Sequence, residues 1–160
     1  MNDSVFMEEA LSLAKEAYAL GEVPIGCVIV QDGKIVGRGK NTRETEKTAL
    51  GHAEIQAIAD ACQNLGGWRL WNCTLYVTLE PCPMCAGAII NARIPRVVFG
   101  AWDEKNGAFG SVCDLSQMPF THKPQVEQGV QESECQALLQ DFFQDLRQSL
   151  KDRPKWKKRL

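Results

Sequence analysis

The pattern of hydrophobic and polar positions predicts helices that alternate with short strands along the chain. Apolar residues recur at three- and four-residue steps over about residues 4–20, which predicts an amphipathic helix that Gly21 can end. Residues 25–31 are apolar and β-branched, and Asp32-Gly33 follows them. Because this dipeptide is typical of two-residue hairpins, we expect an antiparallel return strand over residues 34–39.

The middle of the chain continues the alternation of polar, helical and apolar strand-like stretches. One of the predicted helices opens at Pro83, which agrees with the tolerance of proline at the first helical position. The predicted elements are a loop over residues 40–51, a helix over about 52–65 stopped by Gly66-Gly67, a strand over 73–79, a helix that opens at Pro83 and ends before Pro95, and a short buried strand over 96–100.

The C-terminal third of the chain combines a loop-like stretch with one long amphipathic helix. Residues 101–125 carry scattered glycines and prolines and are expected to be mostly loop. The last helix is predicted to open at Ser133, with Gln136 three residues on completing a capping box. Its apolar stripe, spaced at the helical period, consists of Cys135, Leu138, Leu139, Phe142, Phe143, Leu146 and Leu150.

This order of elements predicts an α/β fold with three layers, α/β/α. The opening hairpin is antiparallel and the later strands alternate with helices, so the sheet should be mixed and covered by helices on both faces. At 160 residues the chain is long enough for one domain. We assign this domain to residues 1–150 and treat residues 151–160 as a basic C-terminal tail.

The composition is that of an ordinary folded protein, with 44% hydrophobic and 24% charged residues. No apolar run approaches the ~18 residues of a membrane span. The first residues, Met1 to Ser4, lack the basic and apolar regions of a secretory signal. A cytoplasmic location without a membrane partner is therefore expected, and the seven irregularly spaced cysteines should be reduced thiols.

The net charge of −2 conceals an uneven distribution. Residues 151–160 carry a net charge of +5, whereas the first 150 residues carry −7. A basic end on an acidic body can contact nucleic acid, and it can equally be a solubilising tail. The sequence leaves both interpretations open.

Two short segments carry the candidate chemistry: His52-Ala53-Glu54 and, further along, Pro81-Cys82-Pro83-Met84-Cys85. His52, Cys82 and Cys85 are three ligands of the kinds that zinc takes. A catalytic zinc keeps three protein ligands and leaves its fourth position to water, whereas a structural zinc is closed by four. Glu54 could then move protons for that water, which indicates a zinc hydrolase.

Two other interpretations of the cysteine pair have to be considered. Cys82 and Cys85 could form a redox dithiol at a helix N-terminus, although a redox pair needs no His-x-Glu partner. A closed structural zinc site would need a fourth ligand. The remaining candidates are Cys27, Cys62, Cys73, Cys113, Cys135 and His122. Four of these cysteines lie in apolar or helical patterns and are expected in the core, and His122 is expected to be a solvated surface residue.

The spacing of His52 and Glu54 does not by itself prove that they converge. Two positions apart on an ideal helix, side chains point about 200° away from each other. The two residues can share a site only if that site straddles the first turn of the helix. The sequence alone does not decide this.

The metal motif, together with further matching segments, resembles the zinc-dependent cytidine/nucleobase deaminase superfamily. Within it the chain is similar to the tRNA-specific adenosine deaminase branch, over about residues 5–150 and not in the tail. The segments that carry this resemblance are 22–26, Asn41, 74–82, 86–89, Arg93-Ile94 and 96–100.

The resemblance implies a cytidine-deaminase-like fold with a mixed five-stranded sheet, and one Zn²⁺ per chain on His52, Cys82 and Cys85. It implies that Glu54 is the catalytic proton shuttle and that Asn41 hydrogen-bonds the base. Asp103 and Lys105 would contact flanking anticodon nucleotides, although a solvated loop remains an alternative for them. Trp102 could stack on a base, whereas Phe142 and Phe143 are expected mainly to pack in the protein.

The implied function is hydrolytic conversion of adenosine to inosine at the wobble position of a tRNA anticodon, by a homodimer. A deaminase of free bases or nucleosides would share the same metal motif and differ in the surface around it. A zinc-stabilised RNA-binding module without catalysis is the second alternative. It would not need Glu54.

Overall fold

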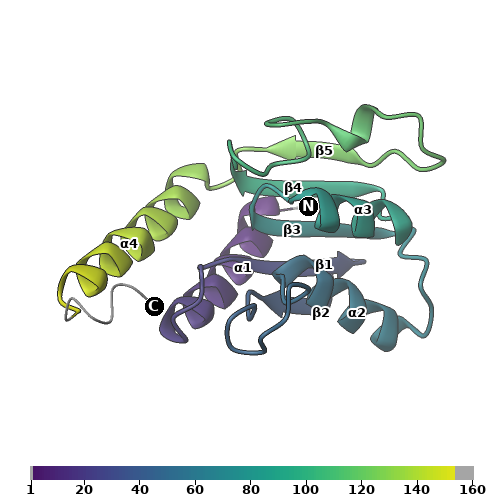
Figure 1. Ribbon diagram of the computed structural model, residues 1–160. Helices are drawn as coiled ribbons and strands as arrows, with labels where there is room; N and C mark the ends of the chain where they lie inside the picture. The colour runs from purple at the N-terminus through teal and green to yellow at the C-terminus, as the bar shows by residue number, and fades with distance from the viewer. Residues whose placement is uncertain (1, 154–160) are drawn as a thin grey trace.

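Helices cover both faces of a five-stranded sheet in the computed structural model, which describes residues 2–153 (Figure 1). Helices α2 and α3 lie on one face, and α1 and α4 lie on the other. The elements are α1 (Asp3–Ala19), β1 (Gly26–Gln31), β2 (Lys34–Lys40), α2 (Ala53–Leu65), β3 (Cys73–Leu79), α3 (Pro83–Asn91), β4 (Arg96–Ala101), the 3₁₀ turn η1 (Leu115–Gln117), β5 (Gln125–Gln128) and α4 (Glu132–Lys151). The predicted three-layer α/β class is confirmed.

The strand order β2-β1-β3-β4-β5 makes the sheet mixed. β1 pairs antiparallel with β2 and β3, whereas β3, β4 and β5 run parallel. The hairpin between β1 and β2 turns at Asp32 and Gly33, whose φ angles of 51° and 76° are both positive. Positive φ at both central positions is what a type I′ turn requires, one of the two usual turns of two-residue hairpins, so the predicted hairpin is confirmed.

The structure differs from the predicted elements at two places near the C-terminus. β5 is a short, half-exposed edge strand of sequence Gln-Val-Glu-Gln, and the hydrophobic pattern gives no signal for such a strand. α4 begins at Glu132 after Gln131, which has a φ of 54° and forms no side-chain cap. The predicted capping box at Ser133 is therefore wrong, because Ser133 already lies inside the first turn.

Alternating residues of the central strands divide the core into two halves. In β1, Cys27 and Ile29 pack against the α2 and α3 side, whereas Val28 and Val30 pack against the α1 and α4 side. The same alternation continues through the buried hydrophobic residues of β3 and, as far as Phe99, through β4. The sheet is therefore buried on both faces, which explains why its strands are nearly continuous apolar runs.

Glycines in β2 allow α2 to lie directly on the sheet. A Cβ atom at Gly39 would lie 2.1 Å from the carbonyl oxygen of Ala53, and one at Gly37 would lie 2.4 Å from that of Ala57. No side chain fits between the strand and the helix at these positions. This contact fixes the first turn of α2 over the end of β2, next to His52.

Only part of the predicted apolar stripe on α4 is buried. Cys135 and Phe142 are buried, whereas Phe143, Leu146 and Leu150 are 41–43% exposed. Figure 1 shows the reason, since α4 leans away from the sheet along its length. The ring of Tyr18 on α1 contacts the Phe142 ring edge-on at 5.4 Å and holds this part of α4 in place.

The C-terminal region is described only as far as Arg153. α4 ends at Lys151, the first residue of the predicted basic tail, and residues 154–160 lie outside the described part. Among residues 2–153, no helix has the length and apolar character needed to cross a bilayer.

Candidate active site

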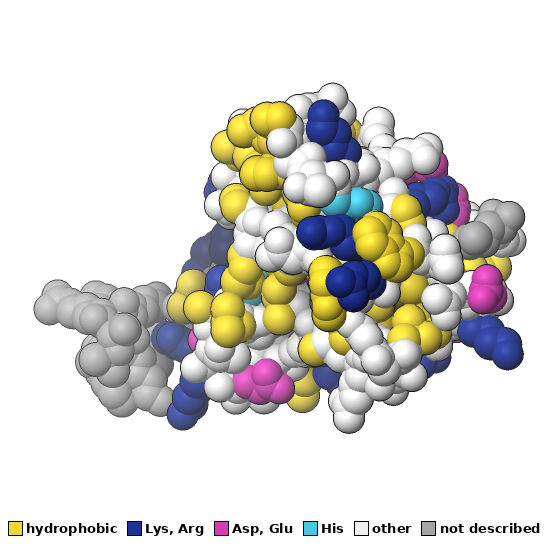
Figure 2. Space-filling view, turned by 90° about the vertical axis from the view of Figure 1, so that its right-hand side faces the viewer, with side chains coloured by type: hydrophobic (Ala, Val, Ile, Leu, Met, Phe, Trp, Pro, Cys, Tyr) yellow, Lys and Arg dark blue, Asp and Glu magenta, His cyan; other side chains and the backbone are white. Residues whose placement is uncertain are grey.

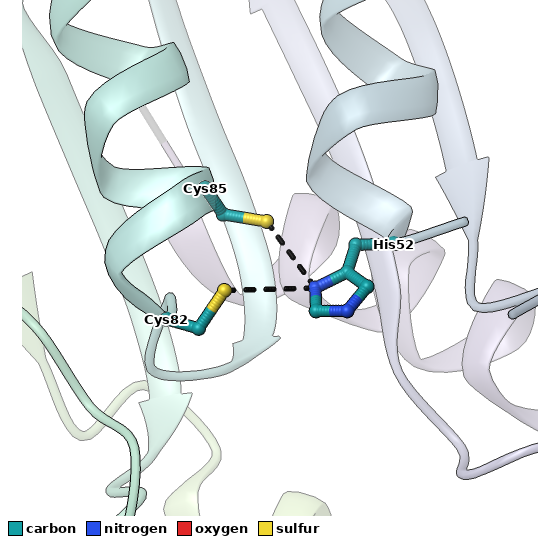
Figure 3. Close-up of side chains that lie close together, drawn as sticks. All are labelled: His52, Cys82 and Cys85. Atoms are coloured by element: carbon teal, nitrogen blue, oxygen red, sulfur yellow. Dashed lines mark hydrogen bonds between the residues drawn. The ribbon is translucent and has the colours of Figure 1, made fainter. Parts of the chain in front are cut away.

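The three predicted metal ligands lie together in the structure (Figure 3). Nδ1 of His52 is 3.6 Å from Sγ of Cys82 and 3.5 Å from Sγ of Cys85, and the ligand atoms all lie within 4.8 Å of one another. At the usual bond lengths to zinc, a sulfur and a nitrogen in tetrahedral positions are about 3.5 Å apart. The donor set and its spacing therefore fit a zinc ion.

Two helix N-termini bring these side chains together. His52 is the N-cap residue of α2, Cys82 is the N-cap residue of α3, and Pro83 opens α3 as predicted. α2 and α3 start at the same end of the same sheet face, so their first turns face each other (Figures 1 and 3). The positive end of each helix dipole favours thiolates at this place.

Glu54 shares this site, which the spacing from His52 left undecided. His52 has extended backbone angles, φ −94° and ψ 147°, and precedes the helix, so helical spacing does not separate the two side chains. Glu54 lies in the first turn and is 4% exposed. Burial raises the pKa of its carboxyl group to about 7.

The two thiols differ in how readily they ionise. The hydrogen bond from Cys85 lowers the pKa of Cys82 to about 4, with burial opposing this effect and His52 adding to it. The pKa of Cys85 is raised, because Cys85 donates to Cys82 and is buried. Hydrogen bonding to Cys82 raises the pKa of His52. Cation binding to both sulfurs would therefore release the Cys85 proton.

No fourth His, Cys, Asp or Glu atom joins this group among the described residues. Cys27, Cys73 and Cys135 are buried in the core as predicted, whereas Cys62 is only partly buried and Cys113 is exposed. A site closed by four side chains is therefore not formed by residues 2–153.

The prediction that His122 is a solvated surface residue is wrong. The side chain is half-buried, and its Nε2 lies 2.6 Å from the carbonyl oxygen of Ile94. Its ring also meets the Trp71 ring edge-on at 6.4 Å. His122 therefore has structural partners in two other connecting segments, at Ile94 and Trp71, and does not join the metal ligands.

A cavity of about 850 Å³ opens over the metal group. One wall consists of the helix starts with His52, Glu54 and Cys82, and the other consists of residues of three loops and of α4. The predicted substrate residues all lie on this second wall. The residues that line it are Val23, Ile25, Asn41, Arg43, Trp102, Asp103, Glu104, Lys105, Asn106, Leu139, Gln140 and Phe143.

Asn41 is 6% exposed, and its side chain is partly used by the protein itself. Nδ2 donates to the carbonyl oxygen of Val23 at 3.1 Å, and Oδ1 accepts from the backbone N–H of Arg43 at 3.1 Å. An amide can donate twice and accept twice, so one donor and one acceptor position remain after these bonds. These bonds fix the orientation of the amide within the cavity wall.

The aromatic residues at and near the cavity differ in how far their rings are exposed. Phe142 is packed in the protein as expected, whereas Phe143 is 41% exposed and lines the cavity. Trp102 is 38% exposed, and its ring meets Phe99 edge-on at 5.0 Å. Trp102 and Phe143 therefore offer apolar surface at the rim of the cavity.

Two buried carboxylates that the sequence interpretation missed organise the loop wall. Glu22 accepts hydrogen bonds from the backbone N–H groups of Glu44 at 3.1 Å and Thr45 at 2.6 Å. Glu80 accepts from the loop that follows β4. An acidic residue directly after the buried strand β3 was a signal that could have singled out Glu80.

The opposite ends of α2 and α3 carry a different surface. Hydrophobic and basic side chains lie side by side on this end of the molecule, with few acidic ones (Figure 2). Trp68 and Trp71, in the segment after α2, are 49% and 53% exposed. The guanidinium groups of Arg69 and Arg93 lie 4.2 Å and 5.7 Å from the Trp68 ring centroid.

The fold and the metal group together define the class of the protein as a deaminase. A family model described as MafB19-like deaminase matches residues 1–147. A solved guanine deaminase from Bacillus subtilis superposes with a TM-score of 0.61 at 34% identity, covering 76% of this chain and 88% of that one.

Closer relatives narrow this class. The chain is 50% identical over 150 residues to a tRNA-specific adenosine deaminase of Bacillus subtilis (strain 168), covering 93% of both chains. It is 46% identical over 148 residues to that of Streptococcus pyogenes serotype M18, covering 92% of this chain and 93% of the other. A solved structure from work on A-to-I editing by tRNA:A34 deaminases superposes with a TM-score of 0.81 at 46% identity. The match covers 84% of this chain and 98% of that one. The chain belongs to the tRNA-specific adenosine deaminase family.

Proposed function

We propose that this protein deaminates adenosine to inosine at the wobble position of a tRNA anticodon. The observation that carries the proposal is the convergence of His52, Cys82 and Cys85 with the buried Glu54 at the floor of one open cavity. Relatives named tRNA-specific adenosine deaminases, 46% and 50% identical to this chain, support the substrate assignment. Water is consumed, and the amino group on C6 of adenine leaves as ammonia.

We infer that His52, Cys82 and Cys85 hold one Zn²⁺ per chain. When bound in such a site, zinc can lower the pKa of a coordinated water to about 7. The chain supplies a neutral imidazole and two thiolates, whose charges balance that of the cation. The low pKa of Cys82 means that one of these ligands is ionised before any cation binds.

Glu54 moves the protons of the reaction. Because its pKa is about 7, it can both accept and donate a proton near neutral pH. It takes a proton from the attacking water, passes one to the ring nitrogen next to C6, and protonates the departing amine. Burial keeps bulk water away from this transfer.

The loop wall binds the nucleotides. Asn41 hydrogen-bonds the edge of the extruded adenine through the donor and acceptor positions that Val23 and Arg43 leave free. Asp103 and Lys105, on the loop that follows β4, contact the flanking nucleotides. A base in a single-stranded loop costs little to unstack, which suits an anticodon substrate.

The protein acts as a homodimer in the cytoplasm. The exposed Trp68 and Trp71 supply apolar surface that a second copy would remove from water. Light scattering on the purified protein tests this assembly, and a monomeric mass at micromolar concentration would contradict it.

The function is tested with a tRNA anticodon stem-loop that carries adenosine at the wobble position. Incubation should release ammonia, and sequencing should then find the wobble A replaced by a base that pairs as G. Free adenosine, cytosine and guanine serve as controls and should not be turned over. Comparable turnover of a free base would contradict the proposal and favour a free-base deaminase.

A further inference from the structure

The carboxylate of Glu80 is enclosed by the loop that follows β4. Glu80 is 2% exposed, and its two oxygens accept four hydrogen bonds. Oε1 accepts from the backbone N–H of Asp103 at 3.0 Å and from the hydroxyl of Ser111. Oε2 accepts from the backbone N–H groups of Phe109 at 3.0 Å and Ser111 at 3.1 Å. One buried charge thus joins both ends of the loop.

The loop fits closely around this carboxylate. A Cβ atom at Gly107 would lie 2.2 Å from the carboxyl carbon of Glu80, so only glycine leaves room for it. The N–H of Ala108 also donates to the carbonyl oxygen of Pro81 at 2.9 Å. The loop is therefore fastened to the segment that leads directly to Cys82.

The hydrogen bond to Asp103 continues into the turn that faces the cavity. Oδ1 of Asp103 accepts from the backbone N–H groups of Lys105 at 3.2 Å and Asn106 at 3.1 Å. The carbonyl oxygen of Asp103 accepts from Gly107 at 2.8 Å. Residues 103–106 belong to no helix or strand, so these bonds and the one to Glu80 hold the turn.

We propose that Glu80 is a positioning residue for RNA recognition, which holds the 103–111 loop so that Asp103 and Lys105 face the substrate. This inference rests on the proposed function. All four bonds of the Glu80 carboxylate go to the loop, and none goes to His52, Cys85 or Glu54. Glu80 therefore affects how tightly the anticodon loop binds and leaves the proton transfers unchanged.

Glu80→Gln is expected to break one of these bonds selectively. At the Oε2 position both partners are N–H donors, so an amide nitrogen there would meet two donors. At the Oε1 position the Ser111 hydroxyl can rotate and accept. The amide nitrogen should therefore take the Oε1 position, and the bond from the N–H of Asp103 is lost.

The kinetic test compares wild type, Glu80→Gln and Ser111→Ala on the anticodon stem-loop. Glu80→Gln should raise KM about tenfold, the usual effect of one lost hydrogen bond with a charged partner, with kcat within about twofold. Zinc content should be unchanged. Ser111→Ala keeps the bond to Asp103 and should leave both constants within about twofold. A fall in kcat or zinc content at unchanged KM in Glu80→Gln would overturn the proposal.

A double-mutant cycle with Lys105→Ala tests whether Glu80 acts through the loop. Lys105 is exposed, and its truncation removes only a side chain that faces the cavity. In the Lys105→Ala background, Glu80→Gln should raise KM by a markedly smaller factor than in wild type. Strictly multiplicative effects would contradict the positioning role.

Amide hydrogen exchange in the RNA-free protein separates this proposal from the proposed function. The Asp103 N–H should exchange faster in Glu80→Gln than in wild type, whereas the Phe109 N–H should keep its protection. Unchanged protection of Asp103 would refute the positioning role, even if the enzyme deaminates tRNA. Conversely, a wild-type protein that deaminates no stem-loop would refute the proposed tRNA deamination. The exchange rates would still show whether Glu80 holds the 103–111 loop.

Discussion

The two walls of the cavity are built in different ways. On the metal wall, His52, Glu54, Cys82 and Cys85 sit at the first turns of two helices that pack on the sheet. On the loop wall, Asn41 and Asp103 belong to irregular segments whose backbone N–H groups donate to a buried carboxylate, Glu22 or Glu80, besides their other bonds. Regular secondary structure therefore holds the predicted metal ligands, and buried carboxylates help to hold the loop wall.

The difference matters because the two kinds of support fail differently. A helix terminus is held by many backbone bonds and packing contacts, so its side chains stay in place when one neighbour changes. A loop segment that depends on a buried carboxylate for a backbone hydrogen bond loses that bond when the carboxylate is altered, while its other bonds remain. Burial disfavours the charge of Glu22, but hydrogen bonds from Thr45 and Glu44 outweigh burial and hold its pKa below the ordinary value. The loop and the carboxylate thus stabilise each other.

The largest effect is expected from removing a ligand on the metal wall. Cys82→Ser should abolish deamination and lower the zinc content to near zero, because two ligands hold zinc far more weakly than three. The melting temperature should also fall, since bound zinc contributes to folding. Metal analysis, calorimetry and the stem-loop assay measure these changes. Cys113→Ser alters an exposed cysteine outside the group and is the matched control. Full activity of Cys82→Ser without zinc would contradict the claim that the metal wall holds a zinc ion needed for deamination.

Glu54→Gln should come next, since it changes the proposed proton shuttle and leaves the three predicted metal ligands in place. Its kcat should fall by about 10²–10⁴-fold, the usual contribution of a positioned acid or base. Zinc content, melting temperature and affinity for the stem-loop should stay close to wild type. Unchanged turnover would instead favour an RNA-binding module in which Glu54 has no chemical role.

Glu22→Gln should alter the loop wall alone. The amide nitrogen of Gln would face a backbone N–H of Glu44 or Thr45, so one of the two bonds is lost. KM for the stem-loop should rise about tenfold while kcat and zinc content stay the same. Glu44→Gln changes an exposed side chain of the same loop and should have no effect. A fall of kcat in Glu22→Gln as large as the rise in KM would show that the two walls are not independent.

The smallest effect is expected for an ion pair away from the cavity. The guanidinium of Arg96 binds both oxygens of Asp3, at 2.9 Å and 2.7 Å, and Glu127 at 2.6 Å. The hydrogen bond from Arg96 lowers the pKa of Asp3 below its ordinary value of 3.8. The charged form is thus stabilised by folding, so this contribution is present above about pH 4 and is lost as pH falls through the lowered pKa.

Asp3→Asn should lower the free energy of unfolding by about 1 kcal/mol at pH 7. The difference from wild type should shrink as the pH falls below about 4, because wild-type Asp3 becomes protonated as the pH passes through its lowered pKa. Urea unfolding at several pH values measures this. KM and kcat at pH 7 should not change, since the pair lies outside both walls. A raised KM in Asp3→Asn would show that the Asp3–Arg96 ion pair influences substrate binding at the cavity.

Much of the metal wall could be predicted from the sequence, because its signals are local. The strand Cys73–Leu79 has the predicted bounds, Pro83 opens its helix, and the hairpin turns at Asp32 and Gly33. Hydrophobic periodicity and the conformational preferences of proline and glycine act over a few residues. The donor types His and Cys then singled out the group that could hold a metal, although only the extended backbone of His52 brought Glu54 beside it.

The loop wall was decided by tertiary structure. Glu80 and Ser111 are bonded although they are far apart in the chain, and the same holds for Glu22 and Thr45. No local pattern encodes such a hydrogen bond, nor the polar edge strand β5, nor the angle at which α4 leaves the sheet. The sequence by itself determined which residues can bind a cation and where the helices and central strands begin. Only the folded chain decided which loops face that cation, because buried charges select backbone partners by proximity in space and not by order in the sequence.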